Sequence, residues 1–225
     1  MQQIIVVLED NKESWQVIYT AYEIAARTGS NLIGAIISGT KPSDPDQRLE
    51  REFETGARAA GVRSKINTFS SLDQLIAFPD ERDALFVSRA SLTEQKALDQ
   101  IMALMPCPLW IIPSQRSIRN ILVLLDGIEK NSPALSLALS LARRQQTPLI
   151  FIGTGAGVPS DVEISELDMV RLNETNIDLD FVLKELKTNL VDLVFVSWPW
   201  ENFHLWSAIQ KSECVFALAP LFSSI

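Results

Sequence analysis

Two aspartates end the first apolar run in each half of this sequence, and they are the first residues that could do chemistry. Asp10 follows the run that starts at Ile4, and Asp126 follows the run that starts at Ile121. Either carboxylate could bind a ribose hydroxyl or a metal-bound phosphate. Each could equally cap the turn that follows it, because a short acidic side chain accepts hydrogen bonds from nearby backbone amides.

A cluster of rings near the C-terminus is the second candidate site. Large aromatic side chains that follow an apolar run could fill a cleft from within, or they could form a surface that contacts a partner protein. The cluster consists of Trp198, Trp200, Phe203, His204 and Trp206. We expect at least one of Trp198, Trp200 and Phe203 to turn inward near Asp126, and the others to stay partly exposed.

The sequence lacks the residue patterns on which enzymes depend. His204 is the only histidine, and no serine or cysteine nucleophile pattern lies beside it. Neither a catalytic triad, nor a pair of catalytic acids, nor the ligand spacing of a metal site can be assembled. We therefore expect a protein that is not an enzyme and binds no metal.

The segment Gly153–Gly157 has the alternating glycines of some phosphate-binding loops. A lone Gly-x-Gly-x-Gly is weak evidence, because such a loop binds phosphate at the start of a helix. No clear helix follows this segment, so the pattern favours a flexible loop.

Composition narrows the classes of function. The chain has 225 residues, of which 47% are hydrophobic, and its net charge is −8. That acidity argues against nucleic acid, because binding to phosphates needs a basic face. No apolar run approaches the roughly 20 residues that span a bilayer, and the first apolar run starts too close to Met1 for a signal peptide. The two cysteines predict buried thiols in a reducing cytoplasm.

The two halves of the sequence repeat one another, and the repeat decides the domain organisation. Three pairs of similar segments occur in the same order, 116, 109 and 107 residues apart. Colinear matches of this kind indicate a tandem duplication. We therefore predict one domain at residues 1–116 and a second, shortened domain at 117–225. The paired segments are marked by Asp10 and Asp126, by Asp83 and Asp192, and by Cys107 and Cys214.

Apolar runs alternate with helical patterns in the first domain, which predicts a doubly wound parallel α/β sheet with right-handed crossovers. The expected strands are Ile4–Leu8, Leu32–Ile37, Ser64–Phe69, Ala84–Ser88 and Leu109–Ile112. The expected helices are one from an N-cap at Ser14 to Arg27, Gln47–Ala60 after a loop at Lys41–Asp46, Ser71–Ala77, and Glu94–Leu104.

The second domain follows the same order but lacks a good second helix. Its expected strands are Asn120–Leu125, Leu149–Ile152, Asp168–Leu172, Leu193–Ser197 and Val215–Ala219. Its expected helices start at Asn131 or Ser132, at Leu179 and at Phe203. The missing crossover helix should leave this sheet less covered on one face.

Two features together resemble the universal stress protein family over nearly the whole chain, as a tandem pair. One is a strand that ends in Asp, followed by a helix that closes on Leu141–Arg144. The other is Asp-x-x-x-Val-Ser, a helix, and Pro106-Cys107-Pro108 before the last strand. The resemblance implies two tandem five-stranded parallel sheets of order 3-2-1-4-5, like the adenine nucleotide alpha hydrolases. It also implies that the units pair through their last strands, as an intramolecular pseudo-dimer open to further homodimerisation.

The resemblance also implies a nucleotide cleft, in the members that bind ATP, with a glycine-rich signature after the fourth strand. In this chain the first two glycine positions of that signature hold other residues. They match Ser88 and Ser91 in the first domain, and Ser197 and Trp200 in the second. The interval from the fourth strand to the cysteine is also short, so the phosphate loop looks deleted. Asp10 and Asp126 match the adenosine-side carboxylate. In each domain the carboxylate of the nucleotide site therefore remains, while its phosphate loop is missing.

Three functions stay open, and the missing glycines favour the first. It is a non-catalytic regulatory protein of the universal-stress type, with decayed ATP sites and an unidentified protein partner. The second is a nucleotide-binding switch or weak ATPase that holds ATP or AMP in a non-standard way through Asp10 or Asp126. The third is a regulatory module akin to those attached to membrane transporters, here without the membrane part.

Overall fold

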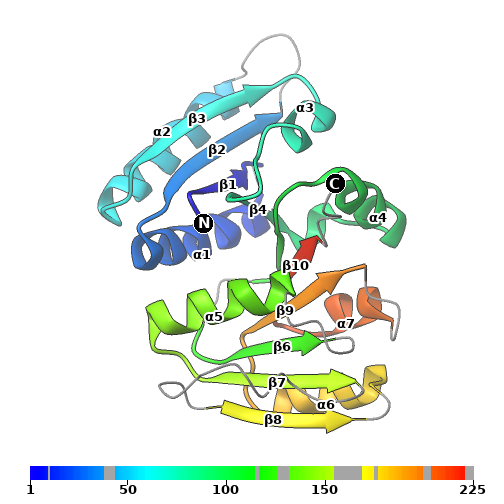
Figure 1. Cartoon of the computed structure of the whole chain (residues 1–225). Coiled ribbons are helices and arrows are strands. Elements are labelled where there is room, and N and C mark those ends of the chain that lie inside the picture. Colours follow the sequence, from blue (N-terminus) through cyan, green and yellow to red (C-terminus); the bar gives the residue numbers. More distant parts are fainter. Residues whose placement is uncertain are drawn as a thin grey trace. The chain divides into compact units, whose positions relative to one another are not determined.

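The structure is a computed structural model, and it describes most of the chain in two compact units, Met1–Gln115 and Arg116–Ile225 (Figure 1). The division falls one residue before the boundary predicted between residues 116 and 117. Each unit is described by itself. The described residues are 1–9, 11–37, 44–114, 117–125, 132–154, 169–174, 177–199 and 204–220.

The first unit has five parallel strands in the order β3-β2-β1-β4-β5, as predicted. Strand β1 lies between β2 and β4, where Ile5 is level with Ile33 and Leu85. Residues Ala84 to Ser88 are all buried, as expected of a parallel strand that is covered on both faces. The strands are β1 (Gln3–Val7), β2 (Asn31–Ile37), β3 (Ser64–Phe69), β4 (Ala84–Ser88) and β5 (Leu109–Ile112).

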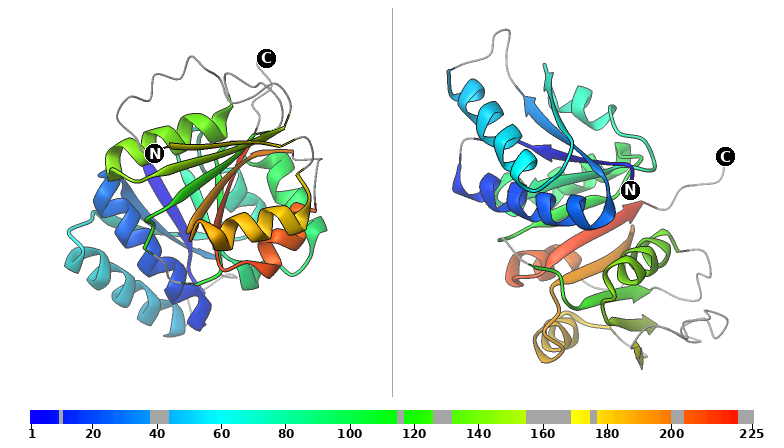
Figure 2. Two further views of the ribbon diagram at one scale, coloured as in Figure 1. Left: turned by 90° about the horizontal axis from the view of Figure 1, so that it is seen from below. Right: turned by 90° about the vertical axis from the view of Figure 1, so that its left-hand side faces the viewer.

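Helices cover both faces of this sheet. Figure 2 shows α1 and α2 side by side on one face, and Figure 1 shows α3 and α4 on the other. This is the distribution that right-handed crossovers produce when the strand order reverses at β1. The elements are α1 (Lys12–Thr28), α2 (Asp44–Ala59), α3 (Leu72–Ile76), the 3-10 helix η1 (Arg89–Ser91) and α4 (Gln95–Leu104).

The start of α1 corrects one prediction. Asn11 is the N-cap, and its Oδ1 accepts the N–H of Ser14 at 2.7 Å. Ser14 lies inside the first turn instead, where its Oγ accepts the N–H of Glu9 at 3.0 Å. Both residue types cap helices, so the sequence pattern alone chose the wrong one. The end is as predicted, because Gly29 adopts φ 69°, a left-handed conformation that favours glycine.

The start of α2 corrects a second prediction. The helix begins at Asp44, three residues before the expected Gln47, so the predicted loop at Lys41–Asp46 is helical at its end. Pro45 does not prevent this, because proline fits the first turn of a helix, where its missing N–H has no intrahelical partner. Leu49, Phe53 and Ala57 then form the buried stripe that packs on the sheet.

The second unit repeats the topology of the first. Its parallel strands have the order β10-β9-β6-β7-β8, in which β6, the first in sequence, lies between β7 and β9. When the strands are numbered from β6 and the order is read from β8 to β10, it is again 3-2-1-4-5. The strands are β6 (Ile121–Leu125), β7 (Leu149–Thr154), β8 (Met169–Glu174), β9 (Leu193–Trp198) and β10 (Val215–Pro220).

Three helices of the second unit are described. Helix α5 (Pro133–Gln145) is capped by Ser132, one of the two predicted N-caps, and covers one face of the sheet. Helices α6 (Leu179–Thr188) and α7 (Leu205–Lys211) pack together on the other face (Figure 2). Residues 155–168, where the sequence predicted no good helix, lie outside the described residues.

Both cysteines are free and buried, as predicted. Burial raises the pKa of the Cys107 thiol to about 12, so this group stays protonated and unreactive near neutral pH. The thiol of Cys214 lies 3.1 Å from the carbonyl oxygen of Val191, to which it donates. Within the described part of the chain, no helix is long and apolar enough to cross a bilayer.

Candidate functional site

In the first unit, the carboxyl ends of β1 and β4 bring Glu9 and Ser91 together. This edge is where the strand order reverses, the usual ligand position in a doubly wound sheet. The Oγ of Ser91 donates to Glu9 Oε2 at 2.9 Å, and the side-chain amide of Asn11 donates to the same oxygen at 2.9 Å. Glu9 was not among the predicted site residues. It precedes Asp10 directly, and only its contact with Ser91, 82 residues away, reveals its position.

Ser88 lies at the end of β4 but directs its hydroxyl into its own turn. The side chain is buried, with 5% of its surface exposed, and its Oγ accepts the N–H of Ala90 at 3.1 Å. This bond caps the 3-10 helix η1. The structure therefore brings Ser88 and Ser91 to one edge, as predicted, but each hydroxyl already has a partner within the protein.

Ser197 occupies the equivalent place in the second unit and is also engaged internally. Its hydroxyl lies 2.7 Å from the hydroxyl of Ser132, and both residues are buried. The Oγ of Ser132 also accepts the N–H of Leu135 at 3.4 Å, as the N-cap of α5. Ser197 thus links the end of β9 to the start of α5, away from solvent.

The other predicted ligand residues are described only in part. Asp10 and Asp126 lie outside the described residues, so their predicted roles stay predictions. Gly153 belongs to β7, which continues to Thr154 and is longer than the expected Leu149–Ile152. The remaining glycines of that motif lie outside the described residues.

Three of the five residues of the aromatic cluster are described. Trp198 is the last residue of β9 and is half-buried, and Trp206 is half-buried in the first turn of α7. His204 is exposed at the start of that helix and makes no side-chain capping bond. Trp200 and Phe203 lie outside the described residues. Whether a ring of this cluster fills a cleft near Asp126 stays a prediction.

Comparison with known proteins places this geometry in a known fold. No protein-family model matches the sequence, and no curated protein matches it either. Solved structures do match. A universal stress protein from Archaeoglobus fulgidus has a TM-score of 0.72 with 10% sequence identity, over 99% of this chain and 97% of that one. The fold is that of the universal stress proteins.

Two structures from Pseudomonas aeruginosa share this universal-stress fold. One is a functionally unknown protein, with a TM-score of 0.66 and 14% identity over 98% of this chain and 92% of that one. The other is a candidate universal stress protein, with a TM-score of 0.67 and 15% identity over 98% and 93% of the two chains. At these identities the likeness concerns the fold.

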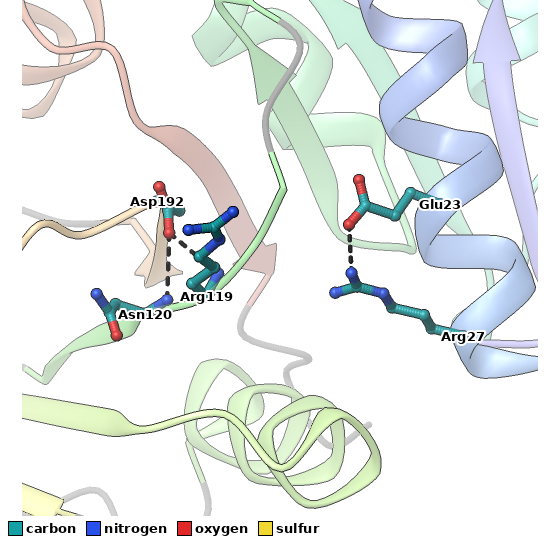
Figure 3. Close-up of polar contacts among 5 residues, drawn as sticks. All are labelled: Glu23, Arg27, Arg119, Asn120 and Asp192. Carbon is teal, nitrogen blue, oxygen red and sulfur yellow. Dashed lines mark hydrogen bonds and ion pairs between the residues drawn. The ribbon is translucent and has the colours of Figure 1, made fainter.

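Two aspartates at the opposite edge of the universal-stress fold have a structural role that the sequence did not reveal. Asp83 Oδ1 accepts the N–H of Gln3 at 3.1 Å, and its Oδ2 accepts the N–H of Asp80 at 3.2 Å. In the second unit, Asp192 Oδ2 accepts the N–H groups of Arg119 and Asn120 at 3.0 and 3.2 Å (Figure 3). Each carboxylate therefore ties the start of the first strand to the fourth.

Burial raises the pKa of Asp83, although the backbone N–H groups that it accepts act in the opposite direction. A perturbed carboxyl group is often a sign of a functional site. Here it lies at the amino-terminal edge of the sheet, away from Glu9 and Ser91, and it accepts two backbone N–H groups and, at 3.5 Å, the side-chain amide of Gln3. The repeated Asp83 and Asp192 are thus part of the framework that positions the strands.

The described residues offer no metal centre. Within the described ranges, no group of three or more His, Cys, Asp or Glu side chains is placed to hold an ion. Among the described residues of the first unit, the polar groups gathered at the carboxyl edge include the carboxylate of Glu9, the hydroxyl of Ser91 and the side-chain amide of Asn11. Such a set can bind a ligand through hydrogen bonds.

Proposed function

We propose that this chain is a non-catalytic stress-response protein of the universal-stress type, which regulates another protein by direct contact and whose ATP sites have decayed. One observation carries the proposal. The hydroxyls at the positions expected to approach phosphate all make bonds within the protein: Ser88 to Ala90, Ser91 to Glu9, and Ser197 to Ser132.

The chemistry of phosphate binding supports this proposal. A triphosphate is normally held by exposed backbone N–H groups in a glycine-rich turn at a helix N-terminus. In the first unit, the turn after β4 is the 3-10 helix η1. The Oγ of Ser88 already accepts the N–H of Ala90, so this donor is not available to a phosphate. The carboxylate of Glu9 lies beside the same turn and repels phosphate oxygens unless a cation intervenes.

Contact with a protein partner is the second part of the proposal. Trp198 and Trp206 are half-buried residues of the second unit. Tryptophan is enriched at the energetic centres of protein interfaces, because a large ring buries much apolar area at a low entropic cost. We therefore assign the aromatic cluster as the surface that binds the partner.

Calorimetry with ATP, ADP and AMP, each with and without Mg²⁺, tests the decayed sites. We expect the ATP dissociation constant to exceed about 1 mM, which corresponds to less than about 4 kcal/mol of binding free energy. Micromolar ATP binding would instead support the alternative, a nucleotide switch or weak ATPase that depends on Asp10 or Asp126. If that site is the one beside Asp10, Ser91→Trp should block it, whereas Ser70→Trp, at an exposed position elsewhere in the first unit, should not.

Comparative purification from cells tests the partner surface. The wild-type chain and a Trp206→Ala variant are purified in parallel under stress and control conditions. We expect a protein that copurifies with the wild type in a fixed ratio and is lost from the variant. Phe78→Ala removes a ring of the first unit that is 38% exposed and should retain the partner. Equal recovery with all three proteins would contradict the assignment.

A further inference from the structure

A groove between α1 and α2 of the first unit is lined by rings on one side and by a charged helix on the other. It encloses about 540 Å³, a size within the range of about 300–1,000 Å³ that is usual for small-molecule sites. The residues that line it are Trp15, Tyr19 and Tyr22 from α1, and Arg51, Glu52, Thr55 and Gly56 from α2. None of them belongs to the polar set at the carboxyl edge of the sheet.

The three rings follow one another along α1. The ring centres of Trp15 and Tyr19 lie 6.2 Å apart, and those of Tyr19 and Tyr22 also lie 6.2 Å apart. The side chain of Tyr19 is 48% exposed, whereas that of Tyr22 is 6% exposed and forms the floor. The groove therefore offers aromatic surface that a flat ring could cover.

The floor of the groove is held in place by two contacts. The hydroxyl of Tyr22 donates to the carbonyl oxygen of Phe53 at 2.7 Å. Gly56 makes room for the Tyr22 ring, since a Cβ atom at this position would lie 2.7 Å from its nearest ring atom. The ring is thus fixed before any ligand arrives, which reduces the entropy that binding would cost.

Charge decides which aromatic ligand fits. Glu23 lies one turn after Tyr19 and pairs with Arg27 at 2.6 Å (Figure 3), and Glu52 pairs with Arg48 at 3.7 Å. The side chain of Arg51 makes no hydrogen bond or ion pair with another described residue. Glu23 and Glu52 are therefore each paired within their own helix, and the guanidinium of Arg51 is left beside the rings.

We infer that this groove binds a small planar aromatic anion, whose ring stacks on Tyr19 and Trp15 and whose carboxylate pairs with Arg51. A guanidinium group suits this role, because its planar array of N–H donors matches the two oxygens of a carboxylate. The inference is independent of the proposed function, since the two sites share no residue.

Three naphthalene probes of similar size and different charge test the inference. They are 2-naphthoate, neutral 2-naphthamide and the cationic 2-naphthylmethylammonium. Isothermal titration measures their affinities, and amide chemical shifts locate the bound probe. We expect a dissociation constant below about 1 mM for 2-naphthoate and weaker binding of the other two. The largest shifts should fall in residues 15–22 and 51–56.

Matched variants identify the contacts. Arg51→Gln should weaken 2-naphthoate binding by between about 1.4-fold and 5-fold, the usual range for an exposed ion pair. Arg58→Gln removes a charge that is also exposed, on the same helix but outside the groove, and should leave the affinity unchanged. Tyr19→Ala should weaken binding by between about 2-fold and 12-fold, as expected for the loss of one stacked ring. The thermal midpoint of each variant confirms that it is folded.

Three results would overturn the inference. The first is an absence of heat and of chemical shifts with 2-naphthoate at about 1 mM. The second is equal affinity for the cationic probe, which would show that the rings and Glu52 attract cations instead. The third is the same affinity in Arg51→Gln and Arg58→Gln, which would remove the carboxylate contact.

Discussion

The buried phenol of Tyr22 gives the sharpest test of the packing between α1 and α2. Its hydroxyl donates to Phe53 at 2.7 Å from a side chain that is only 6% exposed. Tyr22→Phe removes this bond and keeps the ring. The carbonyl of Phe53 lies inside α2, so it keeps its helical N–H partner and is not left unsatisfied. At pH 7 the free energy of unfolding should therefore fall by about 1 kcal/mol.

The same substitution should have a different effect in alkali. Burial raises the pKa of Tyr22 well above its ordinary value of 10, and negative charge on the nearby Tyr19 adds to the shift. Above pH 10 the unfolded chain therefore loses this proton while the folded protein keeps it. The stability of the wild type then falls by about 1.4 kcal/mol per pH unit until the folded-state pKa is reached. The Tyr22→Phe variant has no such group and does not lose this stability. The unfolding free energies of the two proteins should therefore become equal at about pH 11.

Urea denaturation followed by circular dichroism measures both effects. The control is Tyr19→Phe, whose hydroxyl lies on a side chain that is 48% exposed and should change stability at pH 7 by less than about 0.5 kcal/mol. The chain has only these two tyrosines, so the two variants separate their contributions. The reasoning is refuted if Tyr22→Phe matches Tyr19→Phe at pH 7, or if its deficit stays constant between pH 7 and pH 11.

Three further predictions follow from the framework of each unit. Replacing Asp83 or Asp192 by alanine should lower the unfolding free energy by about 1–3 kcal/mol, because each substitution leaves two backbone N–H groups without an acceptor. A loss of stability with only one of the two variants would contradict the equivalence of the two aspartates. Ser197→Ala should cost about 1 kcal/mol in urea, whereas Ser91→Ala, at an exposed bond, should stay within about 0.5 kcal/mol. Halves expressed separately, divided near Ser117, should self-associate in analytical ultracentrifugation, because each carries an apolar last strand; two monomeric halves would contradict the predicted pseudo-dimer.

The sequence by itself determined the positions of most strands and the doubly wound class of each unit, whereas the strand order 3-2-1-4-5 was implied by the family resemblance. Ser64–Phe69, Ala84–Ser88 and Leu109–Ile112 were predicted with the bounds that the structure shows. A continuous apolar run, as in Ala84–Ser88 and Leu109–Ile112, is a local signal, and so is the alternating pattern of Ser64–Phe69. The end of α1 at Gly29 was equally local, because a left-handed residue that closes a helix is usually glycine.

Only the tertiary structure decided how the polar side chains at the carboxyl edges are used. Ser132 and Ser197 are 65 residues apart, and Ser91 and Glu9 are 82 apart. Neither separation has a local signature, because these pairs meet through the parallel pairing of strands that are distant in sequence. The sequence identified the serines as candidates, and the structure shows that each hydroxyl is already hydrogen-bonded.

The groove between α1 and α2 likewise depended on tertiary packing. The spacing of Trp15, Ile18 and Tyr22 is that of one stripe along a helix, which is the usual sign of a buried face. In the structure Ile18 is fully buried, while Trp15 lines the groove and Tyr22 forms its floor. The reason is Gly56, which lacks the Cβ that would displace the Tyr22 ring. A residue on one helix thus determines the position of a ring on another, and no periodicity within either helix records that contact.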